Sequence, residues 1–209
     1  MIMLEPLELD ALTELVNIGV SRAAASLRKM IGQQIVLSVP AIEMMPASEA
    51  AKLIWEREAR PIVAVSQAFA GPFSGRALLI FPEDSGTSLV EIVAGDALPQ
   101  DALQGFEDEA LAETGNIVLN ACLGSIANML QRRLHLSAPV VVRGDGRTLF
   151  QADDPTDAGI VLFLYINFAV EERNITGYIA MVMDLPSLQT LKIVIGDFIG
   201  RVMGSETAS

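Results

Sequence analysis

The sequence predicts an α+β fold: a duplicated domain with pseudo-two-fold symmetry, in which two long helices lie on one face of a mainly antiparallel sheet. Helix-like and strand-like segments follow the same order in both halves of the chain, and the strand-like segments come in consecutive pairs, which favours antiparallel pairing. Of the 209 residues, 51% are hydrophobic and 19% are charged. The chain therefore has enough apolar residues to bury a sizeable core.

The first half begins with the longest helical pattern. Apolar residues recur at helical spacing over 7–30, Pro6 precedes them and Gly32 follows, which predicts a helix with defined ends. Residues 33–45 are rich in Val, Ile and Met and predict a strand, with Pro40 at an edge or a bulge. The other elements that we expect in this half are a short helix over 47–55, strands over 62–70 and 76–81, and a helix over 82–93.

The second half repeats this order after a polar connection over 95–104. A long helix is expected over 106–133, followed by a strand over 134–143 that contains Pro139. Residues 147–152 fit no single element. The remaining predictions are strands over 160–170 and 177–184, separated by a charged turn over 171–174, and a helix over 186–203.

Composition excludes several classes of function. The 14 basic and 26 acidic residues give a net charge of −12, which argues against binding to nucleic acid or to an anionic membrane surface. No apolar run approaches the roughly 20 residues of a membrane span, so membrane insertion is not expected. The first ten residues lack the pattern of a signal peptide, and the single cysteine, Cys122, has no intramolecular partner. We therefore expect a cytoplasmic protein.

A short motif occurs twice in register. Glu14, Asn17 and Pro40 recur as Glu113, Asn116 and Pro139, each 99 positions later, so both copies read Glu-x2-Asn-x22-Pro. Such a repeat indicates an internal duplication. We expect residues 1–209 to form a single domain made of two repeats, at about 7–95 and 106–203.

Each motif lies on a polar stripe of its helix. Each residue of a helix turns by about 100°, so the polar residues of a stripe project from one side of the helix and the apolar residues from the opposite side. Solvated helix faces commonly carry such residues, but asparagine is unfavourable inside a helix and occurs at the same place in both. This favours a pair of similar sites. The two stripes are Asp10, Glu14, Asn17 and Ser21, and Glu109, Glu113, Asn116 and Asn120.

The stripes contain no complete set of catalytic groups. His135 is the only histidine, so a Ser-His or Cys-His pair is not expected, and no known metal-binding spacing is present. A carboxylate can pair with a lysine of a partner, and an amide can orient a water because it both donates and accepts hydrogen bonds. These groups suffice for hydrolysis only if the partner supplies the metal and the labile bond.

The doubled Asp/Ser-x3-Glu-x2-Asn-x22-Pro pattern resembles the CheC-type chemotaxis phosphatases, whose relatives include CheX and FliY. The resemblance covers nearly the whole chain, from about Leu9 to Met203. It implies an enzyme that hydrolyses the aspartyl phosphate of a CheY-like response regulator, which ends a chemotaxis signal. It also implies that the protein has no cofactor of its own and that the regulator supplies Mg²⁺.

The resemblance also implies roles for individual residues. The asparagine would align the attacking water and the glutamate would hold the regulator's lysine. The prolines would shape the strand after each helix. The residues concerned are Glu14, Asn17, Glu113 and Asn116 as catalytic groups, Asp10, Ser21, Glu109 and Asn120 as flanking groups, and Pro40 and Pro139 as structural ones.

The chain departs from the family pattern at two places, and two other functions stay open. Arg22 lies near the first motif, and Glu109 stands where the pattern has Asp or Ser. One alternative is a non-catalytic adaptor of the chemotaxis or flagellar-switch system that binds the regulator or the deamidase CheD. The other is a homodimeric structural protein. The intact Glu–Asn pairs favour the enzyme.

Overall fold

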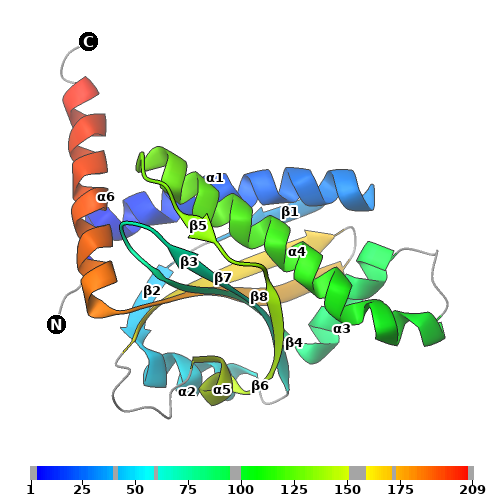
Figure 1. Ribbon diagram of the computed structural model, residues 1–209. Helices are drawn as coiled ribbons and strands as arrows, with labels where there is room; N and C mark the ends of the chain where they lie inside the picture. The colour runs from blue at the N-terminus through cyan, green and yellow to red at the C-terminus, as the bar shows by residue number, and fades with distance from the viewer. Residues whose placement is uncertain are drawn as a thin grey trace.

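A computed structural model describes residues 4–39, 42–58, 61–94, 100–150, 159–170 and 173–206 (Figure 1). One sheet lies between two layers of helices, with α1 and α4 on one face and α2 and α5 on the other. The elements are α1 Pro6–Ile31, β1 Ile35–Ser38, β2 Ile42–Pro46, α2 Ala47–Arg57, β3 Ile62–Ala70, β4 Gly75–Pro82, α3 Glu83–Ala94, α4 Gln100–Met129, β5 His135–Leu136, β6 Val140–Gly144, α5 Gly146–Phe150, β7 Ile160–Val170, β8 Arg173–Met183 and α6 Leu185–Glu206.

The sheet interleaves the two halves of the chain. Its strand order is β1-β7-β8-β4-β3-β5, with β2 also paired with β7 and β6 also paired with β3. All these pairings are antiparallel. The first two strands of each half therefore pair with the third strand of the other half, and β4 meets β8 in the centre. The predicted fold class is confirmed, whereas the division into repeats at about 7–95 and 106–203 stays a prediction.

The two proline-containing strands are each divided in the structure. The segment expected over 33–45 forms β1 and β2, both paired with β7, and Pro40 between them lies outside the described residues. The segment expected over 134–143 forms β5 and β6, both paired with β3, and Pro139 lies between them. Proline has no N–H to donate to a neighbouring strand, which explains a break at Pro139.

Three other segments differ from the prediction. Helix α4 begins at Gln100, within the expected polar connection. The ambiguous segment 147–152 overlaps the short helix α5, and its residues 151 and 152 lie outside the described range. Strand β8 begins at Arg173, inside the expected turn. Tertiary pairing with β7 extends β8 beyond its apolar stretch.

Local interactions explain where α1 begins and ends. At the start, the backbone N–H of Glu5 donates to the Glu8 carboxylate at 2.7 Å, which satisfies a donor that the helix leaves free. At the end, Gly32 takes a left-handed conformation with φ +78° and its N–H donates to the carbonyl of Arg28 at 2.9 Å. Glycine adopts this conformation without the steric cost of a side chain.

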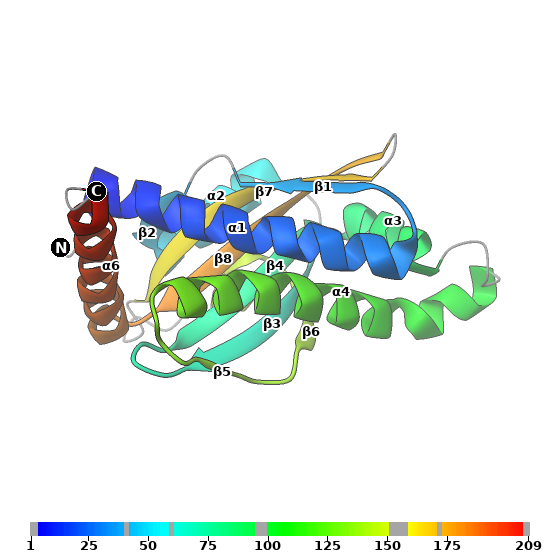
Figure 2. The same ribbon diagram turned by 90° about the horizontal axis from the view of Figure 1, so that it is seen from above.

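Helices α1 and α4 pack side by side and run in opposite directions over the sheet (Figure 2). A Cβ atom at Gly19 would lie 2.6 Å from the Cα of Cys122 and 2.8 Å from the carbonyl oxygen of Ala121. Glycine is therefore what allows the two backbones to approach so closely. The larger apolar core lies between this helix pair and the sheet, and a smaller one lies under α2 and α5.

No helix in the described parts of the chain is both long enough and apolar enough to cross a membrane.

Replacing Gly19 by alanine tests the helix contact. The methyl group would push α4 away from α1, and we expect a loss of about 1–3 kcal/mol in the free energy of unfolding, measured by urea titration. The matched control is Gly124→Ala on α4, where an added methyl has no neighbour within 4 Å. That control should be neutral or stabilising by up to about 1 kcal/mol. Equal stability of the two variants would contradict the close contact.

Cys122 provides a second test of this interface. Its backbone lies at the closest approach of α1 and α4, its thiol is buried, and burial raises the pKa of the thiol to about 12. Because the thiolate is the reactive form, native protein at pH 8 should not react with a disulfide reagent such as DTNB. One thiol per chain should react once the protein is unfolded in guanidinium. Rapid reaction of the native protein would show that Cys122 is accessible.

Candidate functional site

The two predicted stripes lie on the outer flanks of the helix pair, each beside a different edge of the sheet. The stripe of α1 faces the break between β1 and β2, and that of α4 faces the break between β5 and β6, which are at opposite edges. The carboxylates of both stripes and Ser21 are exposed, whereas the three asparagines are half-buried. The structure thus brings each predicted set together, as two separate sites.

In the first site, Asn17 is hydrogen-bonded to the backbone at the strand break. Its Nδ2 donates to the carbonyl of Val39 at 3.1 Å, and its Oδ1 accepts from the N–H of Val39 at 3.0 Å. Val39 follows the last residue of β1, so its backbone groups have left the ladder. The spacing in the motif therefore has a structural basis: the amide satisfies the backbone groups next to Pro40. A primary amide can still donate one and accept one further bond.

A hollow of about 420 Å³ opens beside Asn17. Glu14 borders it and forms no hydrogen bond or ion pair with the described part of the chain. Arg22 borders it too, and its Nη1 donates to the Oγ of Ser125 on α4 at 3.1 Å. A carboxylate, an amide and a guanidinium therefore border one open hollow of the surface. The residues that line it are Glu14, Asn17, Ile18, Ser21, Arg22 and Ala25.

In the second site, a network of amides replaces the backbone contact. The Oδ1 of Asn116 accepts from the Nδ2 of Asn120 at 2.6 Å and from the Nε2 of Gln67 at 3.4 Å. The same Nε2 lies 3.2 Å from the Oδ1 of Asn120 and donates to the carbonyl of Ser137 at 2.7 Å. Gln67 thus satisfies the strand break beside Pro139 and also holds both asparagines of the stripe.

Sequence reasoning missed Gln67, which is 2% exposed and whose Oε1 is buried without a partner. The available signal was one amide in the run 62–70, where Ser66 is the only other polar residue. Strand register shows that the first site has no equivalent. In the second site Leu136 pairs with Phe69, and in the first site Leu37 pairs with Phe168. Gln67 lies two residues before Phe69, and the residue two positions before Phe168 is the buried Ile166. The two sites are therefore built differently.

The charges around the two sites also differ. Near the second site, Arg143 is 2.6 Å from the carboxylate of Asp108, with Glu107 at 3.6 Å and Glu83 at 3.9 Å. The hydrogen bond with Asp108 raises the pKa of Arg143. This cation is therefore neutralised by neighbours, whereas Arg22 in the first site contacts a neutral hydroxyl.

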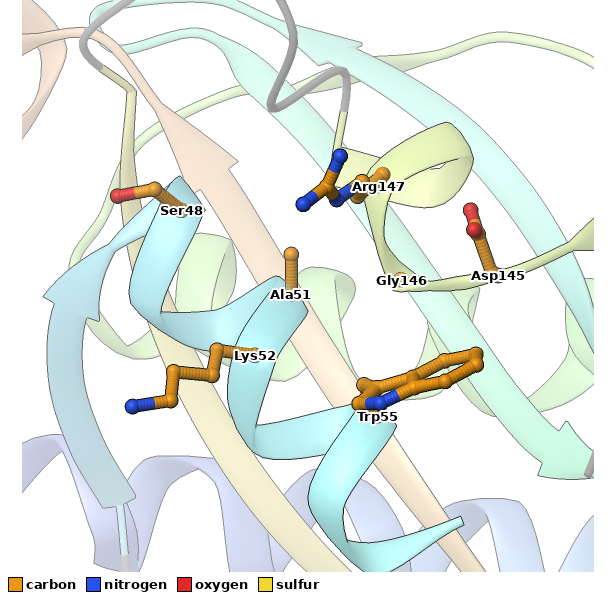
Figure 3. A pocket seen from close by; sticks show the side chains of 7 residues that line it. All are labelled: Ser48, Ala51, Lys52, Trp55, Asp145, Gly146 and Arg147. Atoms are coloured by element: carbon orange, nitrogen blue, oxygen red, sulfur yellow. The ribbon is translucent and has the colours of Figure 1, made fainter. Parts of the chain in front are cut away.

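Other candidate features lie away from the stripes. His135 is exposed on β5. In the ranges that the structure describes, no group of three or more His, Cys, Asp or Glu side chains could hold a metal ion. A second hollow, of about 750 Å³, lies between α2 and α5 on the other side of the sheet (Figure 3). Its lining includes Lys52, the 65% exposed Trp55 and Arg147, but none of the predicted site residues.

Comparisons with known proteins agree with the sequence motif. The CheC-like family profile matches residues 7–44, a segment that contains the first motif. The flagellar motor switch phosphatase FliY of Bacillus subtilis is 24% identical over 207 residues, which are 98% of this chain and 52% of FliY. The CheY-P phosphatase CheC of the same organism is 20% identical over 201 residues, 90% of this chain and 94% of CheC. The chain thus spans about half of the first relative and nearly all of the second.

Solved structures share the fold. The X-ray structure of Thermotoga maritima FliY gives a TM-score of 0.75 at 16% identity, covering 94% of this chain and all of that one. The FliM middle domain of H. pylori gives 0.60 at 7% identity, covering 91% and 99%. CheX of Desulfovibrio desulfuricans gives 0.51 at 16% identity, covering 80% and 99%. These structures show the shared fold, whereas the family profile and the two relatives bear out the resemblance to the CheC-type family.

The contact between Asn17 and Val39 can be tested by hydrogen exchange. Asn17→Ala leaves the N–H and carbonyl of Val39 without their partner, which costs about 1–3 kcal/mol. We expect the Val39 amide proton to exchange at least tenfold faster, as measured by NMR. Asn116→Ala is the matched control, because Asn116 makes no contact with Val39. Unchanged exchange at Val39 in Asn17→Ala would rule out this hydrogen-bond pair.

Proposed function

We propose that this protein hydrolyses the aspartyl phosphate of a CheY-like response regulator and so ends a chemotaxis signal. The observation that carries the proposal is the exposed glutamate one turn before a half-buried asparagine, present on both long helices. Similarity to proteins named as phosphatases supports it. The fold alone does not, because FliM middle domains share it. A non-catalytic adaptor is therefore the alternative that the experiment must separate.

The glutamates are suited to docking. Glu14 and Glu113 are exposed, and neither has an ion-pair partner among the described residues, so each carboxylate is available to a lysine of the regulator. Asp10 and Glu109 lie one turn before them on the same stripes and add negative charge for the same cation. Any Mg²⁺ in the reaction belongs to the phosphorylated regulator, which is the substrate.

The asparagines are suited to positioning a water. Hydrogen bonds to Val39 or to Gln67 hold each amide in place while leaving further hydrogen-bonding capacity. The water oxygen bonds to phosphorus as the bond from phosphorus to the aspartate oxygen breaks. The bonding electrons leave with the carboxylate, and both water protons end on the dihydrogen phosphate product. Holding the water in line with the breaking bond is the contribution expected of the protein.

The two sites lie at opposite edges of the sheet, so each would bind its own regulator molecule. Their different amide contacts suggest that the activities are separable by mutation.

Pro40 and Pro139 would contribute indirectly, by interrupting the strands whose free backbone groups hold the asparagine or glutamine. Binding to CheD and formation of a homodimer stay predictions.

The double variant Asn17→Ala, Asn116→Ala tests the proposal. Radiolabelled phosphate on a CheY-like receiver domain from the same organism is followed over time with each protein. Loss of both water-positioning amides should lower the accelerated rate at least about 100-fold, while binding of the receiver, measured by fluorescence anisotropy, should persist. Asn128→Ala, at an exposed position of α4, is the control and should keep full activity.

Two outcomes would reject the enzyme. Unchanged phosphate loss in the double variant would exclude the asparagines from the reaction. Binding of the receiver by the native protein without any acceleration of phosphate loss would instead identify the adaptor.

A further inference from the structure

Arg22 occupies a distinctive place in the first site. It borders the same hollow as Glu14 and Asn17, and its side chain is exposed. One guanidinium nitrogen is held by Ser125 of α4, whose own side chain is 1% exposed and therefore fixed within the core. A guanidinium has five N–H donors, so this contact orients the group and leaves most of its donors for a ligand.

The charge of Arg22 is not neutralised within the described chain. Its hydrogen-bond partner is a neutral hydroxyl, and no carboxylate in the described ranges forms an ion pair with it. Arg143, beside the second site, has three carboxylates within 4 Å. In a chain with a net charge of −12, an oriented and unpaired guanidinium beside an exposed carboxylate is a group positioned to receive an anion.

The second site lacks this cation. The position 99 residues after Arg22 is Ala121, which ends at its methyl group. Conversely, the second site has the Gln67 network and the first has Ile166. The duplicated sites therefore differ in one charged group that faces the first hollow and in one buried amide that holds the second asparagine.

We propose that Arg22 is a catalytic residue of the first site, where its guanidinium binds the phosphoryl oxygens of the regulator's aspartyl phosphate. This rests on the proposed function. A planar guanidinium binds two phosphoryl oxygens at once, and it stabilises negative charge on those oxygens as the bond to the aspartate breaks. Arg22 takes no proton in the reaction. The first site consequently turns over faster than the second.

Variants that keep only one site test whether Arg22 acts in the first site and not in the second. Asn116→Ala leaves only the first site, and Asn17→Ala leaves only the second. Arg22→Ala and Arg22→Gln are placed in both backgrounds, and kcat and KM are measured with the phosphorylated receiver. In the first-site background we expect kcat to fall by about 10- to 100-fold for both substitutions. In the second-site background kcat should not change.

Arg28→Ala is the matched control, since Arg28 is an exposed cation on the same helix that does not border the hollow. It removes the same charge from α1 and should leave kcat unchanged in both backgrounds. Far-UV circular dichroism establishes that each variant is folded. A loss of twofold or less in the first-site background would overturn the role of Arg22. An equal loss in both backgrounds would also overturn it, because it would indicate general electrostatic steering.

Failure of the proposed function gives a different result. If the native protein accelerates phosphate loss from no receiver, the enzyme is rejected, and binding then decides the role of Arg22. The native protein and Arg22→Ala are titrated with receiver loaded with beryllofluoride, which occupies the place of the phosphoryl group. Binding that is at least tenfold weaker for Arg22→Ala would support anion recognition by Arg22. Equal affinity would reject it.

Discussion

The close antiparallel packing of α1 against α4 is the constraint on which both candidate sites depend. Each helix buries one face against the sheet and its neighbour, and its Glu–Asn stripe lies on the outer flank. Gly19 permits the approach, because any side chain there would meet the backbone of α4. The outer flanks lie over the two sheet edges, where the paired strands are interrupted. Helix packing thus places Asn17 against the backbone of one strand break and Asn116 against Gln67 at the other.

The strand breaks explain the helix-unfavourable asparagine of α1 and, in the second site, the buried glutamine beside the asparagine of α4. A strand break exposes backbone groups that must find partners, and the two halves solve this in different ways. In the first, Asn17 binds both backbone groups of Val39. In the second, Gln67 binds the carbonyl of Ser137 and holds Asn116 from the side. Asn17 therefore has a structural role at its strand break, whereas in the second site that role passes to Gln67.

The exchange of strands between the two halves of the chain also ties the two sites together. The edge strands of the first half pair with β7, and those of the second pair with β3. The backbone at each site is consequently supplied by one half of the chain and its sheet neighbour by the other. The Arg22–Ser125 hydrogen bond also joins the halves, across the helix interface. In the second site, Gln67 of the first half holds Asn116 of the second half.

Features that depend on local spacing could be read from the sequence. Helical periodicity identified both stripes, proline and glycine marked element ends, and the repeated motif indicated two similar sites. Sequence alone did not reveal that 33–45 and 134–143 each form two strands, because an apolar run with one proline does not show which neighbour it pairs with. The partners of the site residues, in contrast, are set by tertiary packing. Asn17 meets a residue 22 positions away and Arg22 one 103 positions away. Such contacts arise from packing, which is why two similar motifs became two different sites.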